Sequence, residues 1–233
     1  MGLRMPARVQ KLALIAGLAL LSALVYGCTA PVLAQQSKLS ASSDPSELWA
    51  FVKRMDARIK ADPQAKYYAG KGQALEWLGK LKEAGDEYTK AIKLAPSDRN
   101  YYIGRARVLR RQHLRVAAER DYTRAIELGD STIEAFAGRA ICRLNMGRFK
   151  DAINDADKSI SLGSSQPEDW YVKGAALFKM GNYDAALRNL NIAVRLAPND
   201  PVYLETRGEV LSKLGKDADS QADIDKAKSL QRY

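Results

Sequence analysis

The sequence predicts an all-α solenoid of five helix-turn-helix repeats that follows an export signal, a tether and a capping helix. Three observations predict this: small and apolar residues recur every 34 residues, each unit carries two helical patterns around a Gly turn, and the chain begins with a basic and then apolar segment. Of its 233 residues 46% are hydrophobic, with only 16 Gly and 8 Pro. This composition fits a packed globular chain and argues against a disordered or fibrous one.

The first 34 residues have the pattern of a secretory signal peptide. Arg4, Arg8 and Lys11 lead the segment without any acidic residue, and the apolar run Leu12–Gly27 follows. This run is shorter than the roughly 20 residues that a membrane span needs. We therefore expect an exported protein, either periplasmic or attached to the extracytoplasmic side of a membrane.

Two outcomes of export remain open. Val32-Leu33-Ala34 resembles a small-residue cleavage site, after which residues 35–45 would form a flexible polar tether. Leu24 to Cys28 resembles a bacterial lipobox, although Tyr26 departs from its small residue. Lipid on Cys28, or an uncleaved N-terminal segment, would instead anchor the chain to a membrane.

The 34-residue period covers residues 65–233 and divides them into 65–98, 99–132, 133–166, 167–200 and 201–233. One position is small in every unit and another is always Leu: Ala84, Ala118, Ala152, Ala186 and Ser220; Leu94, Leu128, Leu162, Leu196 and Leu230. Small residues at fixed places allow neighbouring helices to approach closely. Upstream, residues 46–64 are expected to form one helix that caps the first unit, because the end of a repeat array otherwise exposes its apolar face.

The pattern resembles the tetratricopeptide repeat. Two units carry the family's order of large, small, Leu, Gly and Pro positions most fully: Tyr68, Gly72, Leu75, Gly79, Ala84, Tyr88, Ala91 and Pro96; Trp170, Gly174, Leu177, Gly181, Ala186, Leu190, Ala193 and Pro198. Gly129-Asp130 and Gly163-Ser164 replace the Ala-Pro ending, and His113 stands where Gly is usual. The resemblance implies a right-handed superhelical solenoid that binds other proteins.

No catalytic constellation or metal site is evident in the sequence. His113 is the only His, which excludes a His-based triad or a His-pair metal site, and it is expected to be a solvated turn residue. Cys142 is expected to be a small core residue rather than a reactive thiol. No phosphate-binding Gly motif occurs. We therefore expect a non-enzymatic protein without cofactors.

The resemblance also implies that the first helix of each repeat lines a concave groove. The side chains assigned to this groove are Lys66, Gln73, Trp77, Ile103, Arg107, Arg110, Arg111, Leu144, Asn145, Tyr171, Phe178 and Lys179. Gly70, Gly104 and Gly138 share one repeat position and are expected to leave room for a ligand backbone. The family's Lys/Asn clamp for a C-terminal carboxylate is not reproduced, because Ala69, Gln73 and Gly104 occupy its places.

Two interpretations of this groove remain open. Its apolar residues could hold a peptide or helix while Arg107, Arg110 and Arg111 bind an acidic segment, since Arg pairs bidentately with carboxylate. The arginines could also form a solvated face with little affinity. We expect a non-catalytic adaptor for a partner protein. The alternative is docking of the basic second repeat to anionic envelope lipid or cell-wall polymer; nucleic acid is not expected, because export and the scarcity of aromatic residues argue against it.

Overall fold

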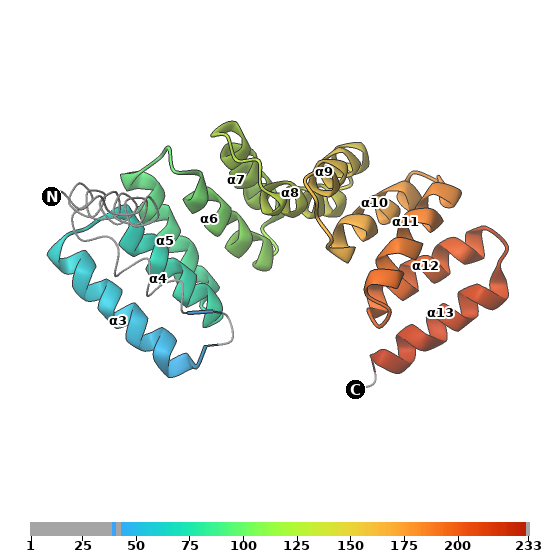
Figure 1. Cartoon of the computed structure of the whole chain (residues 1–233), viewed down its shortest axis with the longest axis horizontal. Coiled ribbons are helices and arrows are strands. Elements are labelled where there is room, and N and C mark those ends of the chain that lie inside the picture. Colours follow the sequence, from blue (N-terminus) through green and yellow to red (C-terminus); the bar gives the residue numbers. More distant parts are fainter. Residues whose placement is uncertain (1–38, 41–42, 232–233) are drawn as a thin grey trace, which may run out of the picture.

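The computed structural model describes residues 39–40 and 43–231, and this part of the chain contains eleven α-helices and no strand. The expected signal peptide, its cleavage site and Cys28 lie outside the described residues. The helices, labelled as in Figure 1, are α3 (Pro45–Ala61), α4 (Ala65–Trp77), α5 (Leu81–Leu94), α6 (Arg99–Arg111), α7 (Arg115–Glu127), α8 (Ile133–Asn145), α9 (Phe149–Ser161), α10 (Pro167–Lys179), α11 (Tyr183–Leu196), α12 (Pro201–Lys213) and α13 (Asp217–Leu230).

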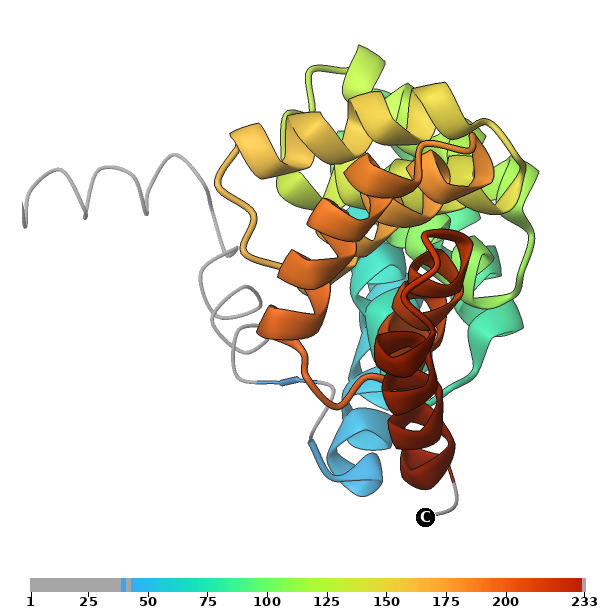
Figure 2. The same cartoon turned by 90° about the vertical axis from the view of Figure 1, so that its right-hand side faces the viewer.

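After α3 the helices form five antiparallel pairs in an open arch, with α3 and α13 at its two ends (Figure 1). Each pair packs against the next through its second helix and the following first helix. The first helices also contact one another directly, in the order α4, α6, α8, α10 and α12. Seen along the arch, the C-terminal pair α12 and α13 lies in front of the helices at the N-terminal end (Figure 2).

The turn inside each pair repeats one backbone conformation. Gly79, Gly147, Gly181 and Gly215 have φ angles from 72° to 80°, which an L side chain rarely adopts, and His113 holds φ 60° at the same repeat position. The following residue then donates its N–H to a carbonyl five residues earlier, as Lys80 does to Leu75 at 2.8 Å and Leu114 to Leu109 at 3.0 Å. His113 is exposed in this turn, as the sequence predicted.

Short polar side chains cap several of the helices that begin a unit. Asp44, Asp98 and Asp200 each accept a backbone N–H from the residue two positions later, and Pro45 and Pro201 occupy the first turn of their helices. These caps start α6 and α12 where the preceding repeat ends, and Asp44 starts α3 upstream of the first repeat. The helix register thus follows the 34-residue period of the sequence.

The core consists largely of the small recurrent residues. Ala84, Ala118, Ala152 and Ala186 are fully buried. The recurrent leucine is exposed in three repeats, as in Leu94 at 52%, and half-buried at Leu128 and Leu230. At the N-terminal end, α3 buries Phe51, Val52 and Met55 against the first pair. Among the residues that the structure describes, no helix is long and apolar enough to cross a membrane.

Candidate partner-binding groove

The first helices α4, α6 and α8 surround a cavity of about 270 Å³. Side chains from neighbouring repeats meet there because these helices contact one another along the arch. The cavity is lined by Ala69, Gln73, Tyr88, Asn100, Tyr101, Ile103, Gly104, Arg107 and Glu134. Gln73, Ile103 and Arg107 belong to the groove assigned from the sequence, and Ile103 is almost fully buried at 7% exposure.

Arg107 links three repeats through two carboxylates. Its Nε and Nη2 donate to Oε1 and Oε2 of the buried Glu76 at 2.8 and 2.9 Å, and its Nη1 donates to Oε1 of Glu134 at 2.6 Å. Burial lowers the pKa of Arg107, but the hydrogen bonds and charge of Glu76 together with Glu134 outweigh burial and raise that pKa above its usual value. Arg107 is therefore a fixed cation in the cavity wall.

The three arginines do not present three free guanidinium groups to a ligand. Arg111 donates to the backbone oxygen of Glu76 at 3.1 Å and lies 3.5 Å from its carboxylate, so it shares the partner of Arg107. Arg110 lies beside the phenol of Tyr122 instead: burial raises the pKa of Tyr122 to about 12, against the opposing charge of Arg110. The basic helix face is thus partly neutralised.

The expected space for a ligand backbone at Gly104 and Gly138 is occupied by the protein itself. A Cβ atom at Gly104 would lie 2.4 Å from the ring of Tyr88, and one at Gly138 would lie 2.3 Å from the ring of Tyr122. Glycine is required at these positions because a tyrosine from the second helix of the preceding pair packs against the backbone there. This expectation is corrected: at these two positions the missing side chain makes room for a core tyrosine, and the cavity opens beside Gly104.

Two uncharged side chains in the cavity have unused hydrogen-bonding capacity. The amides of Gln73 and Asn100 make no hydrogen bond to any other residue in the described part of the chain, and both are accessible. An amide can donate and accept at once, which matches the N–H and C=O groups of an extended backbone. Asn100, Tyr101 and Glu134 were not among the residues assigned from the sequence. Asn100 and Glu134 share the repeat position of Lys66, which could have revealed them.

The aromatic candidates Tyr171 and Phe178 lie further along the arch and pack against other aromatic side chains of the chain. Tyr171 stacks on Tyr203 with ring centroids 4.8 Å apart, and Phe178 packs against Tyr183 at 5.9 Å, with the Lys179 ammonium 5.2 Å from the Phe178 ring. All four aromatic rings are half-buried or buried.

The remaining candidates are dispersed. Leu144 packs on the cluster between α8 and α10, and the Lys66 ammonium lies 5.1 Å from the ring of Tyr67. Trp77 is half-buried near the end of α4. Asn145 lines a different hollow, next to His113 at the turn between α6 and α7. The structure therefore gathers Gln73, Ile103 and Arg107 around one cavity and distributes the others along the array.

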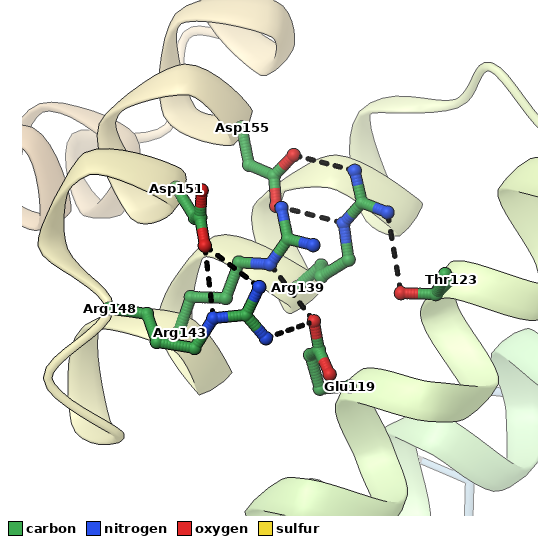
Figure 3. Close-up of polar contacts among 7 residues, drawn as sticks. All are labelled: Glu119, Thr123, Arg139, Arg143, Arg148, Asp151 and Asp155. Carbon is green, nitrogen blue, oxygen red and sulfur yellow. Dashed lines mark hydrogen bonds and ion pairs between the residues drawn. The ribbon is translucent and has the colours of Figure 1, made fainter.

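A second charged cluster lies between α7, α8 and α9 (Figure 3). Arg143 bridges Glu119 and Asp155 at 3.0 and 2.7 Å, and Arg148 bridges Glu119 and Asp151 at 3.0 and 2.7 Å. Each carboxylate already has a cationic partner, so this network joins repeats and offers no free charge to a ligand.

Side chains suited to metal binding are not assembled in the residues that the structure describes. No group of three or more His, Cys, Asp or Glu residues is placed to hold a metal ion there. Cys142 is fully buried, and burial raises the pKa of its thiol to about 11, which confirms the predicted core role.

Comparison with known proteins agrees with the repeat architecture. Two family models described as tetratricopeptide repeat match residues 65–98 and 167–200. No curated protein matches the sequence. Among solved structures, the chain resembles YrrB, a TPR protein with an unusual peptide-binding site, with a TM-score of 0.64 at 19% identity, over 76% of this chain and 92% of that one.

Two further structures have the same fold at low sequence identity. A tetratricopeptide repeat protein from Parabacteroides merdae ATCC 43184 aligns with a TM-score of 0.67 at 22% identity, over 79% of this chain and 73% of that one. MamA from Desulfovibrio magneticus RS-1 aligns with a TM-score of 0.65 at 16% identity, over 72% of this chain and 95% of that one. At these identities the likeness establishes the fold alone.

Proposed function

The chain is a tetratricopeptide repeat protein, and on this premise we propose that it is a non-catalytic adaptor that holds an extended segment of a partner protein in its concave groove. Tetratricopeptide repeat proteins serve in general as protein-protein interaction scaffolds. The observation that carries the finer proposal is the cavity lined by Gln73, Asn100, Arg107 and Glu134, where three repeats contribute polar groups. The solved structure of YrrB, described as a TPR protein with an unusual peptide-binding site, supports the same class of ligand.

The two free amides supply contacts to the ligand's main chain. Gln73 comes from α4 and Asn100 from the start of α6, so an extended backbone that passes between these helices can hydrogen-bond to both. Such contacts are independent of the ligand's side chains and give affinity without sequence specificity.

Arg107 supplies specificity for an acidic side chain or a terminal carboxylate. Its contact with Glu76 is fixed, since that carboxylate is only 3% exposed, whereas its second partner Glu134 has a side chain exposed by 47%. A ligand carboxylate can displace Glu134 and take over the hydrogen bond from Nη1 while the pair with Glu76 remains intact. The preference for an acidic ligand thus rests on one exchangeable contact.

Site-specific photocrosslinking in cells tests this proposal. A photoreactive amino acid at position 73 or 100 should crosslink to a partner protein, while the same group at Gln221 on the exposed face of α13 should not. The variant Gln73→Ala/Asn100→Ala should reduce the recovery of that partner without changing the thermal unfolding of the array. Equal crosslinking from position 221, or undiminished recovery with both amides removed, would move the partner to another surface.

Electrostatic docking to anionic lipid or polymer is less well supported. Of the arginines in repeat two, Arg99, Arg105 and Arg107 form ion pairs with Asp130, Asp121 and Glu76. This leaves fewer unpaired arginines for an anionic surface than the sequence indicates. We further propose that the adaptor acts outside the cytoplasm, from the sequence pattern of residues 1–34. Mass spectrometry of the N-terminus of the protein from its native cell tests this: a chain that begins at Met1 and stays in the cytoplasm contradicts export.

A further inference from the structure

Repeat two departs from the other repeats where its second helix begins. The residue that starts this helix packs inward as Leu81 in repeat one and as Tyr183 in repeat four, but repeat two has the exposed Arg115 there. The residues on either side are apolar and face solvent: Leu114 is 52% exposed and Val116 is 62% exposed. At these two positions repeats one, three and four carry Lys, Arg, Asn or Asp. The apolar side chains thus add little to the core of this repeat.

These side chains border a hollow of about 490 Å³ beside the turn between α6 and α7. It is lined by His113, Leu114, Arg115, Val116, Ala117, Arg120, Asn145 and Met146. The lining includes no acidic residue. A concave apolar surface of this size accommodates one or two large side chains of a ligand.

The positive charges around the hollow have no acidic partner. Arg115 and Arg120 form no ion pair with any residue in the described part of the chain, and both are exposed. The nearest acidic residues along the helix already have partners: Glu119 binds Arg143 and Arg148 at 3.0 Å each, and Asp121 binds Arg105 at 2.7 Å. An incoming carboxylate would therefore meet two uncompensated guanidinium groups, which bind carboxylates bidentately.

We infer that this hollow, which we call the edge site, is a second binding surface that takes an acidic, amphipathic segment of a partner protein. An aliphatic or aromatic side chain of that segment fills the space between Leu114, Val116 and Met146, while its carboxylates pair with Arg115 and Arg120. The occupant follows from charge complementarity and from the concave shape, because a flat bilayer surface would leave a hollow unfilled. The edge site uses the turn after α6, the start of α7 and the end of α8, whereas the groove cavity uses side chains of α4, α5, α6 and the start of α8. The two sites share no lining residue, so the inference does not depend on the groove.

Selection from a phage-displayed library of random 12-residue peptides on the full chain tests the edge site. Peptides that combine an aromatic or aliphatic residue with two or more acidic residues should be enriched. When made synthetically, they should lose about tenfold or more in affinity with Arg115→Ser/Arg120→Ser, and equally with Leu114→Ser/Val116→Ser, as expected when one charge-assisted or apolar anchor is removed. The groove variant Gln73→Ala/Asn100→Ala should bind these peptides as the wild type does.

Three results would overturn the inference. The first is a library that yields no acidic, amphipathic peptides. The second is peptide binding that depends on Gln73 and Asn100 and not on the edge site. The third is binding of phosphatidylglycerol vesicles with the same dependence on Leu114, Val116 and the two arginines, which would make the site a lipid contact. All four substituted residues are exposed, so matching thermal unfolding curves ensure that a loss of binding is not a loss of folding. Loss of peptide binding through the groove variant alone would leave the proposed adaptor function intact.

Discussion

The guanidinium group of Arg139 donates two hydrogen bonds to the carboxylate of Asp155, sixteen residues later, with Nε–Oδ2 and Nη2–Oδ1 distances of 2.8 and 2.7 Å. Its Nη1 donates to Oγ1 of Thr123 in the preceding repeat at 3.3 Å. The same contacts recur one repeat earlier from Arg105, and two repeats later from Arg207 with Asn191 in place of the threonine. Each arginine therefore joins its own two helices to the repeat before it.

Asp155→Ala should be strongly destabilising. It removes the carboxylate that both Arg139 and Arg143 contact, and these side chains are only 12% and 14% exposed. A buried cation without its partner costs about 3–5 kcal/mol. The free energy of unfolding, measured with urea, should fall by that amount.

Asp157→Ala is the matched control for this ion pair. Asp157 pairs with Lys173 at 2.6 Å, but its side chain is 49% exposed. Exposed ion pairs contribute about 0–1 kcal/mol. If Asp155→Ala and Asp157→Ala cost the same, burial of the Arg139–Asp155 pair does not determine its contribution.

His113→Gly should stabilise the array by about 0.5–1 kcal/mol. The residue has φ 60°, whereas glycine holds the left-handed conformation in the other four turns. An L side chain in the left-handed region raises the free energy of the folded state by about 1–2 kcal/mol. Glycine avoids this cost, but its greater conformational freedom in the unfolded chain offsets part of the gain. A higher melting temperature is expected. Gly147→His, the reverse change at the equivalent turn, should lower it; an effect of the same sign from both variants would contradict the role of φ.

Gly138→Ala should destabilise the protein by about 1–3 kcal/mol because its Cβ would lie 2.3 Å from the ring of Tyr122. In the next repeat the large and small residues are exchanged: Val172 occupies the position of Gly138, and Ala156 occupies the position of Tyr122. Val172 and Ala156 belong to the same core cluster. The double variant Gly138→Val/Tyr122→Ala should therefore recover much of the stability that either single change loses. Strict additivity of the two losses in urea unfolding would show that the two positions do not share one space.

The fold could be predicted from the sequence because residues within each repeat determine the helices and the turn of that repeat. Small residues such as Ala84, the turn glycines and the caps at Asp98 and Asp200 act within one unit or between adjacent units, and they recur with the period. The positions that line the cavity also follow the period, which is why Gln73 and Arg107 were identified. Family resemblance alone therefore identified part of the lining of this cavity.

The contacts inside the groove could not be predicted because they depend on residues from different repeats. Arg107 is neutralised by Glu76, 31 residues earlier, and by Glu134, 27 residues later, and neither position is acidic in every repeat. Gly104 was taken for ligand space because its neighbour in the fold, Tyr88, belongs to the preceding second helix. Which side chain fills a gap is decided by packing between units, and repeat position alone does not specify it.

Cys142 should be unreactive toward thiol reagents in the folded protein. It is fully buried in α8, and burial raises the pKa of its thiol from 9.0 to about 11, so both access and ionisation oppose reaction. In a Cys28→Ser chain, where Cys142 is the only thiol, Ellman's reagent at pH 8 should react slowly without denaturant and fast in urea. Because the thiol binds its proton more tightly when folded, its contribution to stability is complete below about pH 9 and is lost as the pH rises to about 11. The added variant Ser161→Cys places a thiol on the exposed end of α9 and sets the rate for an accessible site; a native rate at Cys142 equal to that one would mean that α8 opens readily.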